Sequence, residues 1–302
     1  MPTEHRSRQR LAFAALLVTM LLWAGNAIVG RAVSGAIPPF FLAFCRWAIA
    51  LTVILPFSAR YVVRDRAILV AGWKSILLLG LVGVASFNAF LYSGLHYTTA
   101  ANASLLQAGI PPLVLLLDRI FFGIRSGGRQ IFGIMLSTIG VLIIICQGKV
   151  ETLLGFHFGK GDLIVLGGVV VWASYTSLLR LRPNCHPLSF LVLTFAIAAF
   201  AMFLLAMTEW REIKVIEWHG GVIAAVLYVA LFPSVVAYGL FNFAVEEVGG
   251  ARAGQANNLL PLFGAVLASL LLGERLFAHH LAGMAIIATG IAMSWLTSRR
   301  AG

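Results

Sequence analysis

Asparagine and tyrosine side chains recur together on two apolar segments that lie half a chain apart. Asn88 and Tyr92 are four residues apart, and Tyr238 and Asn242 repeat the pair 150 residues later with the order exchanged. Residues at this spacing share one face of a helix. An amide offers hydrogen-bond donors and an acceptor, and a phenol adds a flat apolar ring. Two such faces could together bind a small organic molecule that carries both polar groups and apolar surface.

Further aromatic and amide residues repeat in the same way. Trp23 and Asn26 correspond to Trp172 and Tyr175 at an offset of 149 residues. Polar groups in apolar segments are costly unless they face a bundle interior or water. We therefore predict one central cavity whose substrate-binding residues are Trp23, Asn26, Asn88, Tyr92, Gln107, Trp172, Tyr175, Tyr238, Asn242 and Asn257. The alternative is that the amides hydrogen-bond neighbouring helices and the rings anchor at the membrane surface.

Arg46 and two prolines stand inside apolar segments. A charge at the centre of a membrane helix costs roughly 2.5–3.5 kcal/mol on insertion scales, so Arg46 must be paired or hydrated. It could bind a substrate carboxylate, or it could bind backbone carbonyls freed near Pro111 or Pro261 and lock two helices. Each proline removes a backbone hydrogen bond, and we predict that both act as hinges.

The composition determines which elements position these residues. The 302 residues are 60% hydrophobic and 11% charged, which is too little charge for the surface of a soluble domain. Ten apolar segments approach the ~20 residues that cross a bilayer: 11–33, 38–57, 74–95, 99–122, 129–147, 161–181, 187–208, 219–244, 251–272 and 278–297. Each must be helical, because unpaired backbone groups in lipid are expensive. The predicted fold class is an all-α integral membrane protein with ten transmembrane helices.

The net charge of +11 reflects membrane topology rather than nucleic-acid binding. With the N-terminus inside, fifteen Lys and Arg residues fall on the inner side of the expected spans and six on the outer side. The positive-inside rule then places both termini in the cytoplasm. We expect no nucleic-acid partner.

The repeat divides the chain into two equivalent parts. Residues 1–148 and 149–302 each carry five expected spans, and the parts form one compact membrane domain. Because five is odd, the second part must enter the membrane from the opposite side. Inverted repeats are typical of carriers that work by alternating access.

The chain resembles the EamA-type carriers of the drug/metabolite transporter superfamily. The matching residues are Trp23-Ala-Gly-Asn26, the Phe-Cys-Arg-Trp segment around Arg46, Gly273-Glu274-Arg275-Leu276, and the glycine-rich last span from Gly283 to Gly290. Gly123-Ile124-Arg125 departs from the family's Gly-Glu-Arg pattern. Within the superfamily the chain is most similar to bacterial exporters of aromatic and other hydrophobic amino acids. The resemblance implies ten spans, a hydrophobic amino acid as substrate, and a multi-pass location in the bacterial inner membrane.

The acidic residues all fall in expected loops, tails or span ends, so the sequence offers no proton relay within the membrane. We therefore predict a facilitator without tight ion coupling, with no cofactor and no metal. The expected partners are a small-molecule substrate and the lipid bilayer, with the carrier a monomer. The alternatives are an exporter of drugs or other metabolites with the same fold and, from another class, a membrane-embedded lipid-modifying enzyme. No nucleophile–base set or metal motif supports the enzyme.

Overall fold

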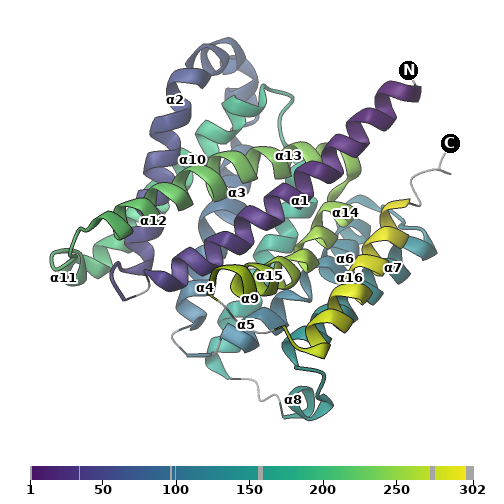
Figure 1. The fold of residues 1–302 in the computed structure, drawn as a ribbon. Helices are drawn as coiled ribbons and strands as arrows, with labels where there is room; N and C mark the ends of the chain where they lie inside the picture. The colour runs from purple at the N-terminus through teal and green to yellow at the C-terminus, as the bar shows by residue number, and fades with distance from the viewer. Residues whose placement is uncertain are drawn as a thin grey trace.

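The described residues form helices joined by turns and irregular connections, without a strand among them (Figure 1). The computed structural model describes residues 2–33, 35–95, 97–98, 100–155, 159–272 and 276–296. In chain order the elements are α1 (Pro2–Ala32), α2 (Pro39–Ala71), α3 (Trp73–Leu79), η1 (Gly80–Ser86), α4 (Phe87–Leu95), α5 (Ala100–Gln107), α6 (Ile110–Phe122), α7 (Gly128–Ile145), α8 (Val150–Leu154), α9 (Lys160–Leu178), η2 (Leu179–Leu181), α10 (Pro187–Ala206), η3 (Met207–Glu209), α11 (Trp210–Ile213), α12 (Gly220–Ala230), η4 (Leu231–Val236), α13 (Ala237–Val248), α14 (Gly250–Gln255), η5 (Ala256–Asn258), α15 (Leu259–Leu272) and α16 (Ala278–Leu296).

Eight helices in the described residues are long and apolar enough to cross a membrane, and they correspond to the first eight expected spans. The second is much longer than expected, because α2 continues past residue 57 to Ala71. The last two expected spans are helical where the structure describes them, as α14 to α15 and as α16. The all-helical membrane fold is therefore confirmed, whereas the count of ten crossings stays a prediction.

Helix packing follows the sequence repeat. At the repeat offset α1 corresponds to α9, α4 to α13 and α6 to α15. Helix α1 packs on α13 and α15, and α9 packs on the corresponding α4 and α6. The remaining corresponding helices pack on each other, α2 on α10 and α7 on α16. Exchanging the two repeats therefore leaves these helix pairs unchanged.

Glycines bring α7 and α16 close together. A Cβ at Gly133 would lie 2.5 Å from the Gly290 carbonyl oxygen, and one at Gly140 would lie 2.8 Å from that of Gly283. Small residues of this kind let membrane helices approach closely enough for backbone contact. The glycine-rich stretch from Gly283 to Gly290 is thus a packing surface, whereas Gly273, Glu274 and Arg275 lie outside the described residues.

Helices α2 and α10 each provide, near or just after their C-terminal end, a carboxylate that caps the start of the other helix. Asp65, near the end of α2, accepts hydrogen bonds from the backbone N–H of His186 at 2.7 Å and from Ser189 Oγ at 2.9 Å, at the start of α10. Glu209, just after α10, accepts from the backbone N–H groups of Phe40 and Phe41 at the start of α2. Each carboxylate meets the exposed amides and positive dipole end of the partner helix. These acidic residues do lie at span ends, but they are buried and hydrogen-bonded.

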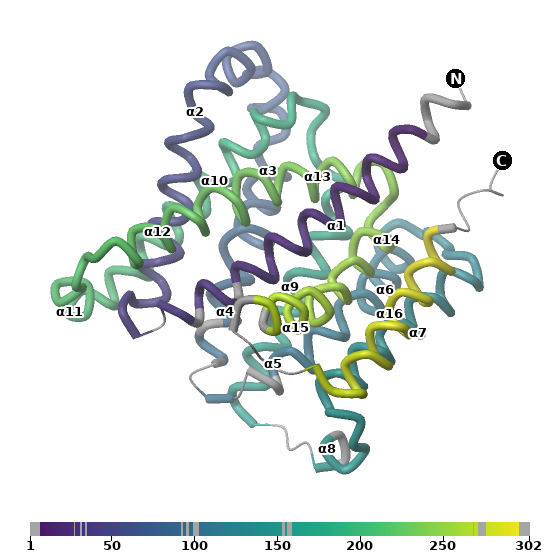
Figure 2. Tube along the Cα trace, in the orientation of Figure 1, coloured from purple at the N-terminus to yellow at the C-terminus, as the bar shows by residue number. Residues whose placement is uncertain are grey.

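The start of the first described helix and the end of the last one lie on the same side of the molecule. Helix α1 begins, and α16 ends, at the upper right of Figure 1, and the tube in Figure 2 follows both. An even number of crossings produces this arrangement. That this side faces the cytoplasm stays a prediction.

Substituting Gly290 by Ala should force α7 and α16 apart, because the new methyl group would meet the Gly133 carbonyl oxygen and the backbone of Ser137. We expect a loss of about 1–3 kcal/mol, as for other overpacked contacts. Thermal unfolding of the purified protein in detergent would show this as a lower Tm. Gly264→Ala is the matched control, since a Cβ there meets nothing within 4 Å. An unchanged Tm for Gly290→Ala would contradict the close packing.

Candidate functional site

Two π-helical segments interrupt long helices at corresponding places. The segment η1 joins α3 to α4, and η4 joins α12 to α13 at the repeat offset of 150 residues. Single π-helical turns are rare and are frequent at functional sites. The sequence analysis missed both. Pro233, which lacks an N–H inside an apolar run, is the signal that could have revealed η4.

Side chains satisfy the polar groups that η4 leaves free. Ser234 Oγ donates a hydrogen bond to the Val229 carbonyl oxygen at 2.8 Å. The Pro233 carbonyl oxygen accepts one from Trp23 Nε1 at 2.9 Å and one from Arg46 Nη2 at 3.3 Å. Helices α1 and α2 are therefore both fastened to the same irregular turn.

Arg46 is held by this turn and by an aromatic ring. Its Nε donates to Ser234 Oγ at 2.6 Å, and its guanidinium carbon lies 4.6 Å from the centroid of the Trp47 ring. These contacts match the helix-locking role considered for Arg46. The carbonyl oxygen that accepts from Arg46 Nη2 is that of Pro233, whereas the sequence suggested one near Pro111 or Pro261.

Pro111 and Pro261 lie beside helix breaks at corresponding positions. Pro111 is the second residue of α6, directly after the break between α5 and α6, and Pro261 follows the 3₁₀ turn η5. At the start of a helix the missing N–H of proline costs little. Both prolines therefore mark interrupted spans, and their role as hinges stays a prediction.

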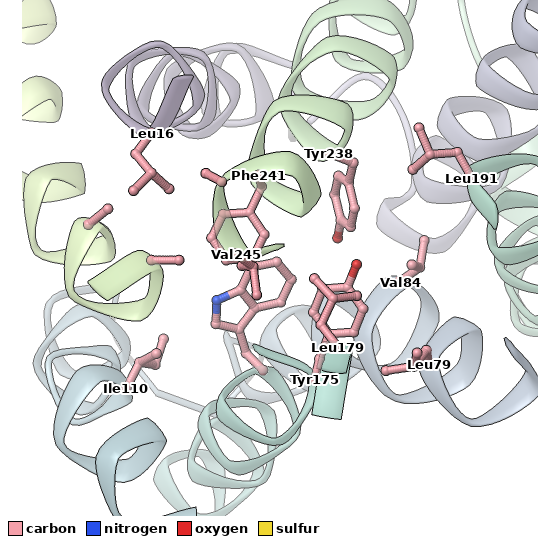
Figure 3. Close-up of a cluster of buried hydrophobic side chains, with 14 of the residues drawn as sticks. Leu16, Leu79, Val84, Ile110, Tyr175, Leu179, Leu191, Tyr238, Phe241 and Val245 are labelled. Atoms are coloured by element: carbon pink, nitrogen blue, oxygen red, sulfur yellow. The ribbon is translucent and has the colours of Figure 1, made fainter. Parts of the chain in front are cut away.

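Aromatic rings fill the centre of the molecule. The Trp23 ring centroid lies 5.2 Å from those of Trp172 and Phe241, and Trp172 lies 5.4 Å from Tyr175. Tyr238 lies within 6.5 Å of Tyr175. Figure 3 shows the hydroxyl groups of Tyr175 and Tyr238 pointing toward each other. We call Trp23, Trp172, Tyr175, Tyr238 and Phe241 the central cluster.

Trp47, Phe87 and Phe195 extend the central cluster. Together the rings occupy the place where the sequence analysis expected an open cavity. Two apolar hollows lie elsewhere, one of about 220 Å³ near Phe40 and Phe90, the other of about 230 Å³ near Trp73 and Ile197. No central-cluster residue lines either hollow. The rings therefore fill the centre of the molecule.

Polar groups inside the central cluster are only partly satisfied. Tyr175 Oη donates to Asn242 Oδ1 at 2.8 Å, whereas Asn242 Nδ2 has no hydrogen-bond partner among the described residues. Trp172 Nε1 likewise has none there. Asn242 and Trp172 are each 3% exposed. Buried donors without partners are uncommon in native proteins and call for an explanation.

The structure gathers five of the ten expected substrate-binding residues: Trp23, Trp172, Tyr175, Tyr238 and Asn242. Gln107 and Asn257 instead hydrogen-bond backbone carbonyls of their own helical turns, those of Ala103 and Gly254. Asn26 is half-buried on α1 and Asn88 is buried on α4. The side chain of Tyr92 lies outside the described part of the chain.

Five central residues were not foreseen: Trp47, Phe87, Phe195, Phe241 and Gly83. Trp47 is part of the Phe-Cys-Arg-Trp segment, and Phe241 directly precedes Asn242, so each had a nearby signal. Gly83 has a steric role, because a Cβ there would overlap the Tyr175 ring. Its correspondence to Pro233 at the repeat offset was the available signal.

Ion pairs close the end of the molecule where α1 begins. Arg8 Nη2 lies 2.8 Å from Glu247 Oε1, and Arg180 Nη2 lies 3.0 Å from Asp118 Oδ2. Asp118 also accepts from Ser177 Oγ at 2.6 Å. Both pairs join a residue of 1–148 to a residue of 149–302. Separating the repeats at this end would therefore break them.

Comparison with known proteins agrees with this architecture. The EamA-like transporter family matches the chain twice, over residues 10–146 and 159–296. The Bacillus subtilis protein named "uncharacterized transporter YyaM" is 30% identical over 218 residues, which cover 72% of this chain and 71% of that protein. "Probable amino-acid metabolite efflux pumps" of Escherichia coli and Salmonella typhimurium are 25% and 28% identical, with at least 91% of each chain covered.

A solved crystal structure has the same fold, with a TM-score of 0.74 at 19% identity over 98% of both chains. The likeness at this identity concerns the fold alone. The two family matches span nearly all of the chain and coincide with the two sets of corresponding helices. The chain belongs to the EamA-like transporter family and is a multi-pass membrane transporter.

Proposed function

We propose that this transporter exports amino acids with aromatic or other large apolar side chains across the bacterial inner membrane. It does so by alternating access, without tight ion coupling. The observation that carries the proposal is the central cluster, where aromatic rings surround an amide donor with no partner among the described residues. The names of the two efflux pumps at 25% and 28% identity support amino-acid metabolites as substrates.

The rings suit an apolar side chain. Aromatic groups prefer offset or edge-to-face contacts with one another, each worth about 0.5–1.5 kcal/mol beyond burial. An incoming aromatic side chain could replace one of the ring–ring contacts that now close the centre. Selectivity from such contacts is broad, because large aliphatic side chains can use the same surface.

The polar groups suit a zwitterion. Asn242 Nδ2 is a buried donor that could bind the substrate carboxylate, and the Gly83 carbonyl oxygen lies nearby, accepting from Tyr238 Oη at 3.5 Å. Such carbonyls could bind the ammonium group. Arg46 lies beside the central cluster, with its guanidinium carbon 4.6 Å from the centroid of the Trp47 ring, and Ser234 and Pro233 already bind it. A largely neutral lining favours a molecule without net charge over a phosphorylated one.

The carboxylates support the absence of tight coupling. Asp65, Asp118 and Glu209 are buried at helix ends, where backbone amides, hydroxyls or Arg180 bind them. Protonating any of them would release helix caps or an ion pair. Proton relays normally use intramembrane acids that are free to titrate.

Counterflow in proteoliposomes tests the substrate class. Vesicles preloaded with unlabelled Trp, Phe or Met should take up the labelled compound transiently with no ion gradient, because a carrier exchanges substrate across its two states. Thr should exchange more weakly, since it has little apolar surface. Absence of counterflow with every amino acid, from protein that unfolds cooperatively, would contradict this class and favour drugs or other metabolites as substrates.

Coupling needs a separate measurement on the same vesicles. An imposed pH gradient without a substrate gradient should drive no net accumulation. Strong accumulation under that gradient alone would overturn the facilitator mechanism and leave the substrate class intact.

Asn242→Leu should weaken binding of amino acids, because it removes the amide that we assign to the substrate carboxylate. A hydrogen bond to a charged group contributes about 1.5–3 kcal/mol, so the apparent KM for Trp should rise by roughly tenfold or more. Inhibition of Trp counterflow by tryptamine, which lacks a carboxylate, should be nearly unchanged. Equal losses for both ligands would show that Asn242 does not bind the carboxylate.

Tyr175→Phe is the matched control. It removes the hydroxyl that donates to Asn242 but leaves the amide and the aromatic ring in place. We expect a change in KM for Trp of less than threefold. A loss as large as that of Asn242→Leu would mean that the Tyr175–Asn242 hydrogen bond itself is what matters.

A further inference from the structure

The two repeats use the same kind of side chain differently at their π-helical segments. Trp23 Nε1 donates to the Pro233 carbonyl oxygen at 2.9 Å. The corresponding residues at the repeat offset are Trp172 and Gly83. Trp172 Nε1 makes no hydrogen bond among the described residues, although the residue is buried. One tryptophan–carbonyl bond is thus made, and its counterpart is open.

The groups needed for the corresponding hydrogen bond, between Trp172 Nε1 and the Gly83 carbonyl oxygen, are present in the second pair. Gly83 belongs to η1, as Pro233 belongs to η4. Its carbonyl oxygen accepts from Tyr238 Oη at 3.5 Å, which is at the outer limit for a hydrogen bond. The Tyr175 ring lies against the Cα of Gly83. The Tyr175 ring thus occupies the space beside Gly83 in this conformation.

We propose that the two tryptophan–carbonyl bonds exchange during transport. In the opposite-facing conformation Trp172 Nε1 donates to the Gly83 carbonyl oxygen, and Trp23 releases that of Pro233. The proposal rests on the proposed alternating access but not on the identity of the substrate. Inverted repeats exchange their conformations between the inward-facing and outward-facing states. A contact that one repeat makes in the present conformation is therefore expected in the other repeat in the opposite-facing conformation.

The exchange keeps the two states close in free energy. In each state one buried indole N–H is bonded and the other is not, so the cost of the unpaired donor is present on both sides of the equilibrium. A ligand with a small preference can then shift the populations.

The repeats are not identical, and this biases the equilibrium. Arg46 corresponds to Phe195, and Ser234 to Val84. After Trp23 leaves, the Pro233 carbonyl oxygen still has Arg46 as a donor, whereas Gly83 has no corresponding arginine. Gly83 lacks a side chain, and this matters in both states. In the present conformation it makes room for the Tyr175 ring. In the opposite-facing conformation it would leave room for the Trp172 indole.

Trp23→Phe and Trp172→Phe test the exchange, because each keeps a ring and removes one indole N–H. Spin labels at Arg10 on α1 and Leu181 on η2 would report opening of the end closed by the Arg8–Glu247 and Arg180–Asp118 ion pairs. Both label sites are exposed. The native cysteines Cys45, Cys146 and Cys185 are first replaced by serine, and distances are measured by pulsed electron paramagnetic resonance in lipid nanodiscs.

The two substitutions should shift the ratio of long to short distances in opposite directions. Trp23→Phe should raise it roughly fivefold to tenfold, the value of one hydrogen bond, and Trp172→Phe should lower it by a similar factor. Trp210→Phe, at a half-exposed residue outside the central cluster, is the control and should leave the ratio unchanged.

A shift in the same direction for both variants, or for neither, would overturn the exchange. A single distance population in the parent protein, with and without Trp, would instead contradict alternating access itself. A changed ratio in Trp210→Phe would mean that the labels report general loosening, which also counts against the exchange. Counterflow measured on the same preparations keeps the substrate question separate.

Discussion

The backbone polar groups released at η4 are the constraint on which the centre of this transporter depends. Within a membrane, an unpaired carbonyl or amide costs several kcal/mol, so irregular backbone persists only where side chains bind it. Trp23, Arg46 and Ser234 provide those bonds. Through them α1 and α2 are attached to the α12–η4–α13 segment, and the aromatic rings pack around the attachment.

Free backbone groups are also satisfied by side chains at the ends of α2 and α10. Helices α2 and α10 are corresponding elements that lie antiparallel, so the end of each meets the start of the other. Asp65 and Glu209 use that geometry to cap the opposite helix. Helices α7 and α16 also correspond to each other, and at their contact glycines provide close packing without any charge. Reciprocal contacts of this type follow from a two-fold relation between the repeats, which the corresponding helix pairs support.

Much of this arrangement could be predicted from the sequence, because it depends on periodic features. Apolar segments of membrane length predicted the helices, and the repeat paired Trp23 with Trp172 and Tyr238 with Asn88 at corresponding positions. Five of the ten expected site residues do lie together. The partner of Arg46 could not be predicted, because Pro111 and Pro261 looked equivalent to any proline in a span. In the structure they follow breaks, whereas Pro233 lies within a continuous helix.

The π-helical segments and the closed centre escaped prediction for a related reason. A change from i→i+4 to i→i+5 hydrogen bonding leaves the apolar pattern of the expected span 74–95 almost unaltered. Gly80 and Gly83 alone do not specify a π-helical segment. Five residues of the expected cavity belong to the observed cluster or contact it.

The separation of charged from neutral residues links the fold to the mechanism. The ion pairs Arg8–Glu247, Arg64–Asp65, Arg180–Asp118 and Arg182–Glu246 lie at the end where α1 begins. The buried carboxylates Asp65 and Glu209 cap helices, and Asp118 binds Arg180. The centre is left with rings, amides and hydroxyls. A conformational change that opens this end must therefore break the Arg8–Glu247 and Arg180–Asp118 ion pairs, and the second of these holds a buried carboxylate. Under the exchange proposed above, the central hydrogen bond lost by one repeat is replaced by one in the other repeat.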